Sequence, residues 1–472
     1  MTANKTLFLA FLFFLLLTIY SLTIPFFWDG TFFSAIACKF YDGCYTVFNY
    51  PPIPDNNTTF PVFSIYLATV WKLFSKSLWI SHLALLPFLL GICYEFYKLA
   101  KRFLINSFVS FSLLLLVFQP TFITQCLIMS HDIILIYLFF LSLNMLLKNS
   151  FTAYRLVILL LAMYSVRGIF LAFSLAIIEF ILAYPQHKYK SFFIIFKNNF
   201  LSFIFVCGYV FYKFQMQEKI ISIYSENPHE QIVPLSMMIR QFLFIVWKMI
   251  DLGQIILWLF FIIGSLLIYK KKNNFNDIKT LAILIFVPAF ITSAFMIPFS
   301  NPVGHRYFMF CYLLLIIGVC YILQQINNKK IVYGCLFIFI AALVTGNCWL
   351  YPERLGNGWD SSLKVIPYFQ LKDDIDEYIQ QNKIPANEIG TQFPLIADKR
   401  FSHLSDSSFQ YVNVWQGPLE NYQYFLQSNV INTDIAEQIE KVKLNWNLLK
   451  EFKSGQVYIR LYKNKIIPSI LQ

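Results

Sequence analysis

The chain of 472 residues is 58% hydrophobic and only 13% charged, whereas about 25% of the residues in an average soluble domain are charged. It contains 53 Phe and 28 Tyr, and its formal net charge is +12. This composition excludes a fold made only of water-soluble domains. We expect no nucleic-acid partner, because the positive excess lies in residues 1–350 while residues 351–472 are nearly neutral.

Apolar stretches of about 20 residues recur along the first part of the chain, and a helix of that length matches the thickness of the hydrocarbon core of a bilayer. The short alternating segments of a membrane barrel are absent from the sequence. We therefore predict a polytopic α-helical membrane protein with about eleven transmembrane helices. They are expected at residues 7–27, 79–97, 103–120, 131–147, 153–166, 168–184, 199–215, 249–269, 279–298, 307–323 and 331–350.

Lys and Arg residues are more frequent in the connections on the side of the N-terminus, which places the N-terminus inside the cell. An odd number of helices then places residues 351–472 outside. Two domains are predicted: a transmembrane catalytic domain at 1–350 and a small soluble extracytoplasmic α/β domain at 351–472. In the second domain we expect a helix at 372–383 and strands at 388–393, 410–415 and 456–463.

The first outer loop is unusual because it contains two amphipathic segments, at 28–43 and 60–74. Asp29 begins this loop, directly after the aromatic end of the first predicted helix. Such a loop is suited to covering a groove that faces lipid. Cys38 and Cys44 share the loop, and they are either a disulfide pair or two free thiols.

This arrangement resembles the GT-C superfamily of integral membrane glycosyltransferases, particularly the bacterial relatives of protein O-mannosyltransferases and of the lipid A aminoarabinose transferase. The resemblance covers roughly residues 1–350 and rests on pattern rather than on one specific motif. The matching features are Asp29, Tyr50-Pro51-Pro52-Ile53, Phe60-Pro61, the LFSKSLWISHL run at 73–83, Ser130-His131-Asp132, Arg167-Gly168 and His305-Arg306-Tyr307. The chain departs from many relatives at Gly30, where they carry a second acidic residue.

The resemblance implies transfer of a sugar from a polyprenyl-phosphate carrier to an acceptor hydroxyl or amine. The leaving phosphate is stable without protonation, so one base suffices, and Asp29 is the candidate. The residues expected to bind the donor phosphate are Arg167, Arg306, His305 and Tyr307. The candidates for binding the acceptor or a divalent metal ion are Asp42, His131, Asp132 and Glu230. Capping of a helix is the favoured role of Asp132, and Arg167 is equally well explained as a side chain that reaches the lipid headgroups.

The partners implied are a polyprenyl-phosphate-linked sugar, a lipid, glycan or protein acceptor, and the lipids of a bacterial inner or plasma membrane. The outer domain is expected to recognise the acceptor, with the alternative that its aromatic side chains Tyr411, Trp415, Tyr422 and Tyr424 form its own core. The alternative functions are an outer-leaflet polysaccharide polymerase or ligase, a transporter of lipid-linked glycans, and a scaffold without catalytic activity.

Overall fold

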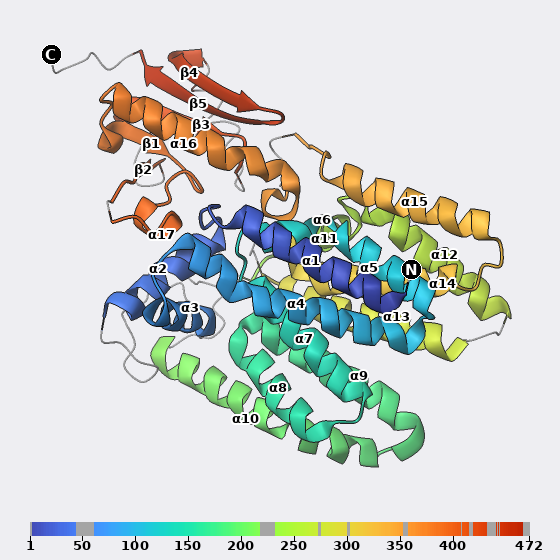
Figure 1. The fold of residues 1–472 in the computed structure, drawn as a ribbon. Helices are drawn as coiled ribbons and strands as arrows, with labels where there is room; N and C mark the ends of the chain where they lie inside the picture. Colours follow the sequence, from blue (N-terminus) through green and yellow to red (C-terminus); the bar gives the residue numbers. More distant parts are fainter. Residues whose placement is uncertain are drawn as a thin grey trace.

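The computed structural model describes residues 2–43, 61–217, 232–271, 275–299, 303–352, 357–406, 408–414, 419–431, 440, 442 and 444–465. A body of helices carries a small domain with a β-sheet at its C-terminal end (Figure 1). The helices of the body are α1 (Ala3–Ser21), α2 (Asp29–Asp42), α3 (Val62–Leu73), α4 (Leu78–Phe103), α5 (Asn106–Val117), α6 (Pro120–Leu127), α7 (Asp132–Leu147), α8 (Phe151–Tyr164), α9 (Val166–His187), α10 (Lys190–Gln217), α11 (Leu235–Ile250), α12 (Gln254–Lys271), α13 (Phe275–Met296), the 3-10 helix η2 (His305–Phe308), α14 (Met309–Leu323) and α15 (Lys329–Gly346).

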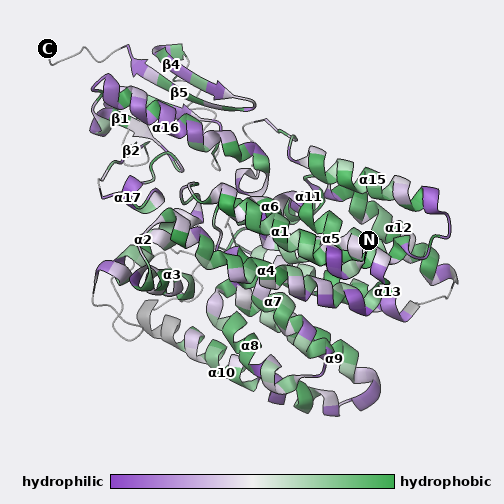
Figure 2. Cartoon of the chain, in the orientation of Figure 1, coloured by the Kyte–Doolittle hydropathy of each residue, from purple (hydrophilic) through white to green (hydrophobic). Residues whose placement is uncertain are grey.

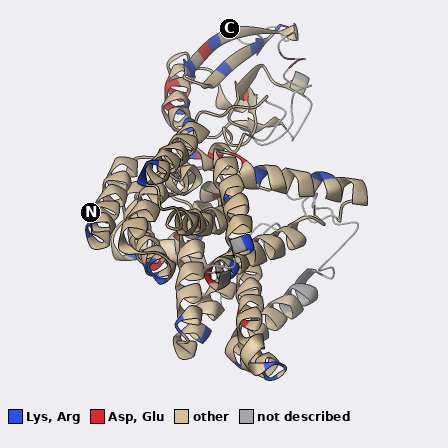
Figure 3. Ribbon diagram, turned by 90° about the vertical axis from the view of Figure 1, so that its right-hand side faces the viewer, with Lys and Arg blue, Asp and Glu red and all other residues tan. Residues whose placement is uncertain are grey.

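Seven helices among the described residues are long and apolar enough to cross a membrane, or nine spans if each of two bent helix pairs counts as one. Large apolar side chains are exposed on these helices, for example Phe193, Ile263 and Phe337 at 75%, 56% and 72%. Figure 2 shows hydrophobic residues along the helices, and Figure 3 shows few charged residues away from the helix ends in the body. These features indicate an integral membrane protein.

The predicted count of eleven spans is not confirmed. The prediction counted α7 and α8 as spans, but these helices have 16 and 14 residues. Both are shorter than the ~20 residues that cross a hydrocarbon core unaided.

The first helix ends earlier than predicted, at Ser21 rather than at residue 27. Residues 22–28 are not helical. Pro25 has no N–H to donate to a helix, and the N–H of Phe26 donates to the carbonyl of Ser402 at 2.8 Å. Asp29 therefore begins α2 and does not follow α1 directly, while α2 and α3 confirm the two helical segments predicted for the first loop.

Two bends join a predicted helix to one that was not predicted. The predicted helix at 103–120 corresponds to α5, and α6, which meets α5 at 56°, lies beyond its predicted end. Helix α11 falls mostly in a region predicted as an outer loop, and it meets α12, the predicted helix at 249–269, at 91°. At this bend Gly253 has φ +83° and packs so closely on helix α15 that a Cβ would lie 2.0 Å from the carbonyl oxygen of Ala342. The break between α8 and α9 falls at Ser165, whose hydroxyl accepts from the N–H of Gly168, and not at Arg167-Gly168 as predicted.

The C-terminal domain contains a five-stranded sheet in the order β2-β1-β3-β5-β4. Its strands are β1 (Ile389–Thr391), β2 (Val412–Asn413), β3 (Tyr424–Ser428), β4 (Trp446–Ser454) and β5 (Val457–Asn464). Strand β1 runs parallel to β2 and β3, and β5 is antiparallel to β3 and β4. The predicted strands at 388–393, 410–415 and 456–463 correspond to β1, β2 and β5. The predicted helix corresponds to α16 (Ile366–Gln381), which begins six residues earlier than expected.

The C-terminal domain packs directly on the helical body. Phe27, Trp28 and Ile128 belong to the same buried apolar cluster as Tyr368 and Ile375 of α16. The short helix α17 (Lys399–Ser402) contacts α2. The domain and the first loop therefore lie at the same end of the bundle, as Figure 1 shows.

The tail aromatics that the sequence suggested for acceptor recognition are largely internal. Tyr411 is 3% exposed and donates its hydroxyl to Asp376 at 2.5 Å, and Tyr422 is 8% exposed. Tyr424 is partly buried in β3, and Trp415 lies outside the described residues. The alternative interpretation, that such side chains build the core of the domain, is correct for Tyr411 and Tyr422.

Candidate functional site

Asp29 is the first residue of α2, and its side chain is 41% exposed. The preceding residue, Trp28, has φ 56° and ψ −132°, a backbone conformation that costs a non-glycine residue on the order of 1–3 kcal/mol. The ring of Trp28 packs edge-on against that of Phe393 of the C-terminal domain, with centroids 5.1 Å apart. This packing holds the turn that presents Asp29.

Arg306, in η2, connects separate parts of the chain through its guanidinium group. Its Nη2 donates to Oδ2 of Asp29, and its Nε lies 3.2 Å from Oδ2 of Asp360 and 3.6 Å from Oδ2 of Asp132. The side chain is only 4% exposed. Three carboxylates from the first loop, from α7 and from the C-terminal domain therefore converge on one buried cation.

Arg167 extends this cluster from the first turn of α9. Its Nη2 lies 2.6 Å from Oδ1 of Asp132 and 2.8 Å from Nε2 of His131. Its Cζ is 4.4 Å from the ring centroid of Tyr307, and Cζ of Arg306 is 5.4 Å from the same centroid. Five of the predicted site residues therefore lie next to one another: His131, Asp132, Arg167, Arg306 and Tyr307. Asp29 contacts this group through Arg306. We call Asp29, Asp132, Asp360, Arg167 and Arg306 the charged cluster.

Asp132 does not cap its helix as predicted. The N-cap of α7 is His131, without a side-chain capping bond, and the N–H of Asp132 donates to the hydroxyl of Ser130 at 3.1 Å. The carboxylate of Asp132, which is 1% exposed, instead faces the two arginines. Ion pairing prevails because two guanidinium groups carry full positive charges, whereas the start of a helix offers about half a charge.

Asp360 is a member of the cluster that the sequence analysis missed. It belongs to the 3-10 helix η3 (Trp359–Ser361), after the predicted boundary at residue 350. Its carbonyl oxygen accepts from Nε2 of Gln125, and its Oδ1 accepts from the hydroxyl of Ser361 at 3.0 Å. One signal was available: Trp359-Asp360 repeats the Trp-Asp pair of residues 28 and 29.

His305 was predicted to bind the donor phosphate, but it points to a different partner. Its Nε2 lies 2.6 Å from Oδ2 of Asp251, whose Oδ1 accepts from the hydroxyl of Tyr351. Gly358, with φ +62°, packs on the imidazole, where a Cβ would lie 2.4 Å from the ring. His305 is fully buried, so its position indicates that it supports η2, which carries Arg306.

The remaining predicted residues do not join the charged cluster. Asp42 ends α2, is 60% exposed and lies 3.6 Å from Nζ of Lys76. Glu230 lies outside the described residues, and so does Cys44, the proposed disulfide partner of Cys38.

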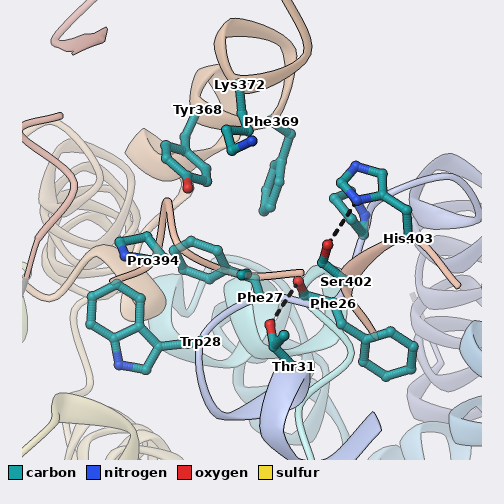
Figure 4. Close-up of a pocket in the computed structure, with 12 residues that line it drawn as sticks. Phe26, Phe27, Trp28, Thr31, Tyr368, Phe369, Lys372, Pro394, Ser402 and His403 are labelled. Carbon is teal, nitrogen blue, oxygen red and sulfur yellow. Dashed lines mark hydrogen bonds between the residues drawn. The ribbon is translucent and has the colours of Figure 1, made fainter. Parts of the chain in front are cut away.

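A narrow hollow lies beside the cluster, between residues 25–31 and the C-terminal domain. Figure 4 shows Tyr368 and Phe369 of α16 above Phe27, with Ser402 and His403 at one side. Its volume of about 30 Å³ holds only one or two water molecules. A sugar ring does not fit the hollow in this conformation, so the charged cluster remains the candidate site.

Within the described ranges, no three or more His, Cys, Asp or Glu residues are grouped so that they could hold a metal ion. The groups beside Asp132 are two guanidinium ions.

No protein-family model matches the chain, and no curated protein matches its sequence. The function therefore has to be argued from the residues and from the geometry of the charged cluster.

Proposed function

We propose that the chain is an integral membrane glycosyltransferase that moves a sugar from a polyprenyl-phosphate carrier to an acceptor hydroxyl or amine. The observation that carries the proposal is the convergence of Asp29, Arg167 and Arg306, which are far apart in the sequence, on one charged cluster at one end of the bundle. Burying ionisable side chains among apolar helices costs free energy of folding, so such side chains usually serve a function.

Asp29 is suited to act as the general base because it is the accessible carboxylate of the cluster. Its side chain is 41% exposed, against 1% for Asp132 and 8% for Asp360. In the proposed reaction Asp29 takes the proton of the acceptor group as that group bonds to the anomeric carbon. The bond from this carbon to the phosphate oxygen breaks, and its electron pair leaves with polyprenyl phosphate.

Arg306 and Arg167 supply the positive charge that a phosphate group needs at the level of the lipid headgroups. One guanidinium group can donate two parallel N–H bonds to two oxygens of a phosphate, and such bonds are stronger where the arginine is shielded from water. Tyr307 lies against both cations and keeps their apolar faces covered. A polyprenyl chain that lies in the membrane would place its phosphate at the level of the headgroups, next to these two arginines.

We further propose that this end of the bundle faces the outside of a bacterial inner or plasma membrane. The support is the distribution of Lys and Arg in the sequence, which favours an inside N-terminus. The end of α1 and the end of α15 both adjoin the C-terminal domain, so an even number of crossings separates them, and α1 itself makes the total odd. Seven, nine and eleven spans all satisfy this condition.

The decisive experiment measures transfer with the purified full-length protein in nanodiscs. Labelled polyprenyl-phosphate sugars are offered together with a membrane-lipid and glycan extract as acceptor. The wild type should transfer label, and Asp29→Asn should lose at least about 100-fold in rate, which is the lower limit of a typical contribution from general-base catalysis. Asp373→Asn, which removes an exposed carboxylate outside the charged cluster, should remain active. An active Asp29→Asn variant would exclude Asp29 as the base.

A further inference from the structure

The charged cluster contains more acids than bases, and this imbalance limits how a phosphate can enter. Asp29, Asp132 and Asp360 face Arg167 and Arg306, so the five side chains together are negative. Adding an anionic phosphate to Arg306 would place a fourth negative group around two cations. Replacing one carboxylate by the phosphate would leave the number of negative groups around the cations unchanged.

The three acids differ in how firmly they are held. Asp132 is 1% exposed and lies 2.6 Å from Arg167, so it keeps a cationic partner when the partners of Arg306 change. Asp360 is 8% exposed and is anchored through its carbonyl by Gln125 and through its side chain by Ser361. Asp29 is 41% exposed and contacts Arg306 only through Oδ2. Asp29 is therefore the carboxylate that an incoming anion displaces most readily.

The two edges of the Arg306 guanidinium separate these roles. Asp360 and Asp132 lie at Nε, whereas Asp29 lies at Nη2. Nε makes no hydrogen bond to the described residues, so it is the charge attraction of these two carboxylates that keeps this edge of the guanidinium turned towards them when the partner at Nη2 changes. The holding residue comes from the C-terminal domain, so the site is incomplete without residues beyond 350.

We propose that the donor phosphate replaces Asp29 at Nη2 of Arg306 while Asp360 holds the Nε edge as a positioning residue. This inference rests on the proposed function. It adds that donor binding itself releases the base: once Asp29 has left the guanidinium, its carboxylate is free to accept the acceptor proton. A base that stayed paired with Arg306 would be a weaker proton acceptor.

The exchange predicts opposite effects of removing the two carboxylates on binding of a long-chain polyprenyl phosphate to the full-length protein in nanodiscs. Asp29→Asn removes the competitor, so affinity should rise about threefold to fivefold, the value of a partly exposed ion pair. Asp360→Asn leaves only Asp132, at 3.6 Å, beside Nε of Arg306, so the guanidinium is less well oriented and affinity should fall by roughly tenfold. Asp360→Glu keeps the charge and should restore most of the affinity.

Matched controls separate the exchange from general effects of charge. Asp373→Asn and Glu451→Gln each remove a carboxylate from the same domain as Asp360, where these side chains are 54% and 31% exposed. Both should bind like the wild type, and the dephosphorylated polyprenol should bind all variants equally weakly. If Asp360→Asn does not fold, the comparison of Asp29→Asn with the wild type decides.

Unchanged or weaker binding by Asp29→Asn would overturn the exchange and leave the proposed function standing. Unchanged or tighter binding by a folded Asp360→Asn would remove Asp360 as a positioning residue. A wild type that binds the phosphate no better than polyprenol would refute the proposed function itself, and the exchange with it.

Discussion

Replacing Arg306 by Ala should destabilise the protein strongly, because Arg306 neutralises buried carboxylates. The loss can be apportioned among its three partners. Asp132 keeps Arg167 at 2.6 Å, so it is not left alone. Asp29 is 41% exposed and regains water, so its pair contributes at most about 1 kcal/mol. Asp360 is 8% exposed and would lose its ion pair, which leaves it only the attraction of Lys248 and Lys364 and costs about 3 kcal/mol. Asp360 therefore dominates the expected loss.

The assay is the thermal transition of the detergent-solubilised protein, with Arg460→Ala as the matched control. Arg460 also pairs with a carboxylate, Glu451 at 2.9 Å, but the two side chains are 24% and 31% exposed, so the loss should be below about 1 kcal/mol. The double variant Arg306→Met with Asp360→Asn leaves no unpaired charge on Asp360 and should recover much of the stability. The reasoning is refuted if Arg306→Ala is as mild as Arg460→Ala, or if the double variant is no more stable than Arg306→Ala.

Two further predictions concern topology and pH. A reporter fused after Gln472 should be extracytoplasmic and one fused after Lys271 cytoplasmic; finding both on one side would contradict the proposed orientation. Burial lowers the pKa of Lys364 to about 8 from its ordinary value of 10.5, and its Nζ donates to the carbonyl of Trp349. The unfolded chain keeps the proton on this amine up to about pH 10.5, whereas the folded chain releases it above about pH 8. The folded protein is therefore stabilised as pH rises from 8 to 10.5, and this stability is lost again as pH falls to 8. The stability gained by Lys364→Met should therefore be larger at pH 7 than at pH 10, as measured by the thermal transitions of the variant and the wild type at each pH. A gain in stability that does not depend on pH would contradict the burial of a charge at Lys364.

The sequence predicted much of the helical body because apolar length and amphipathic spacing are local signals. Helices α2 and α3 were found in this way, and the candidates Asp29, Arg167 and Arg306 stood out as charges beside long apolar segments. The bends were not found. Pro120 and Gly253 are visible in the sequence, but whether such a residue ends, bends or merely interrupts a helix depends on packing such as that of Gly253 against Ala342.

Two strands of the C-terminal domain were also missed, and their burial explains why. Strand β4 is at the edge of the sheet, and after Trp446 its residues are exposed or partly exposed, so it lacks the alternation that indicates a strand. Strand β3 has only five residues and is buried at both of its faces. Asp360 was missed for another reason: it meets Arg306 only because η3 folds back onto α6, a contact that no local pattern encodes.

The most direct test of the central claim is photo-cross-linking with a polyprenyl phosphate that carries a diazirine next to the phosphate. The account predicts labelling of peptides around Arg167 and Arg306, competition by unlabelled polyprenyl phosphate, and little labelling by the matching polyprenol probe. Labelling confined to other parts of the chain, or equal labelling by the polyprenol probe, would contradict the claim that the charged cluster binds the phosphate of a lipid-linked sugar donor.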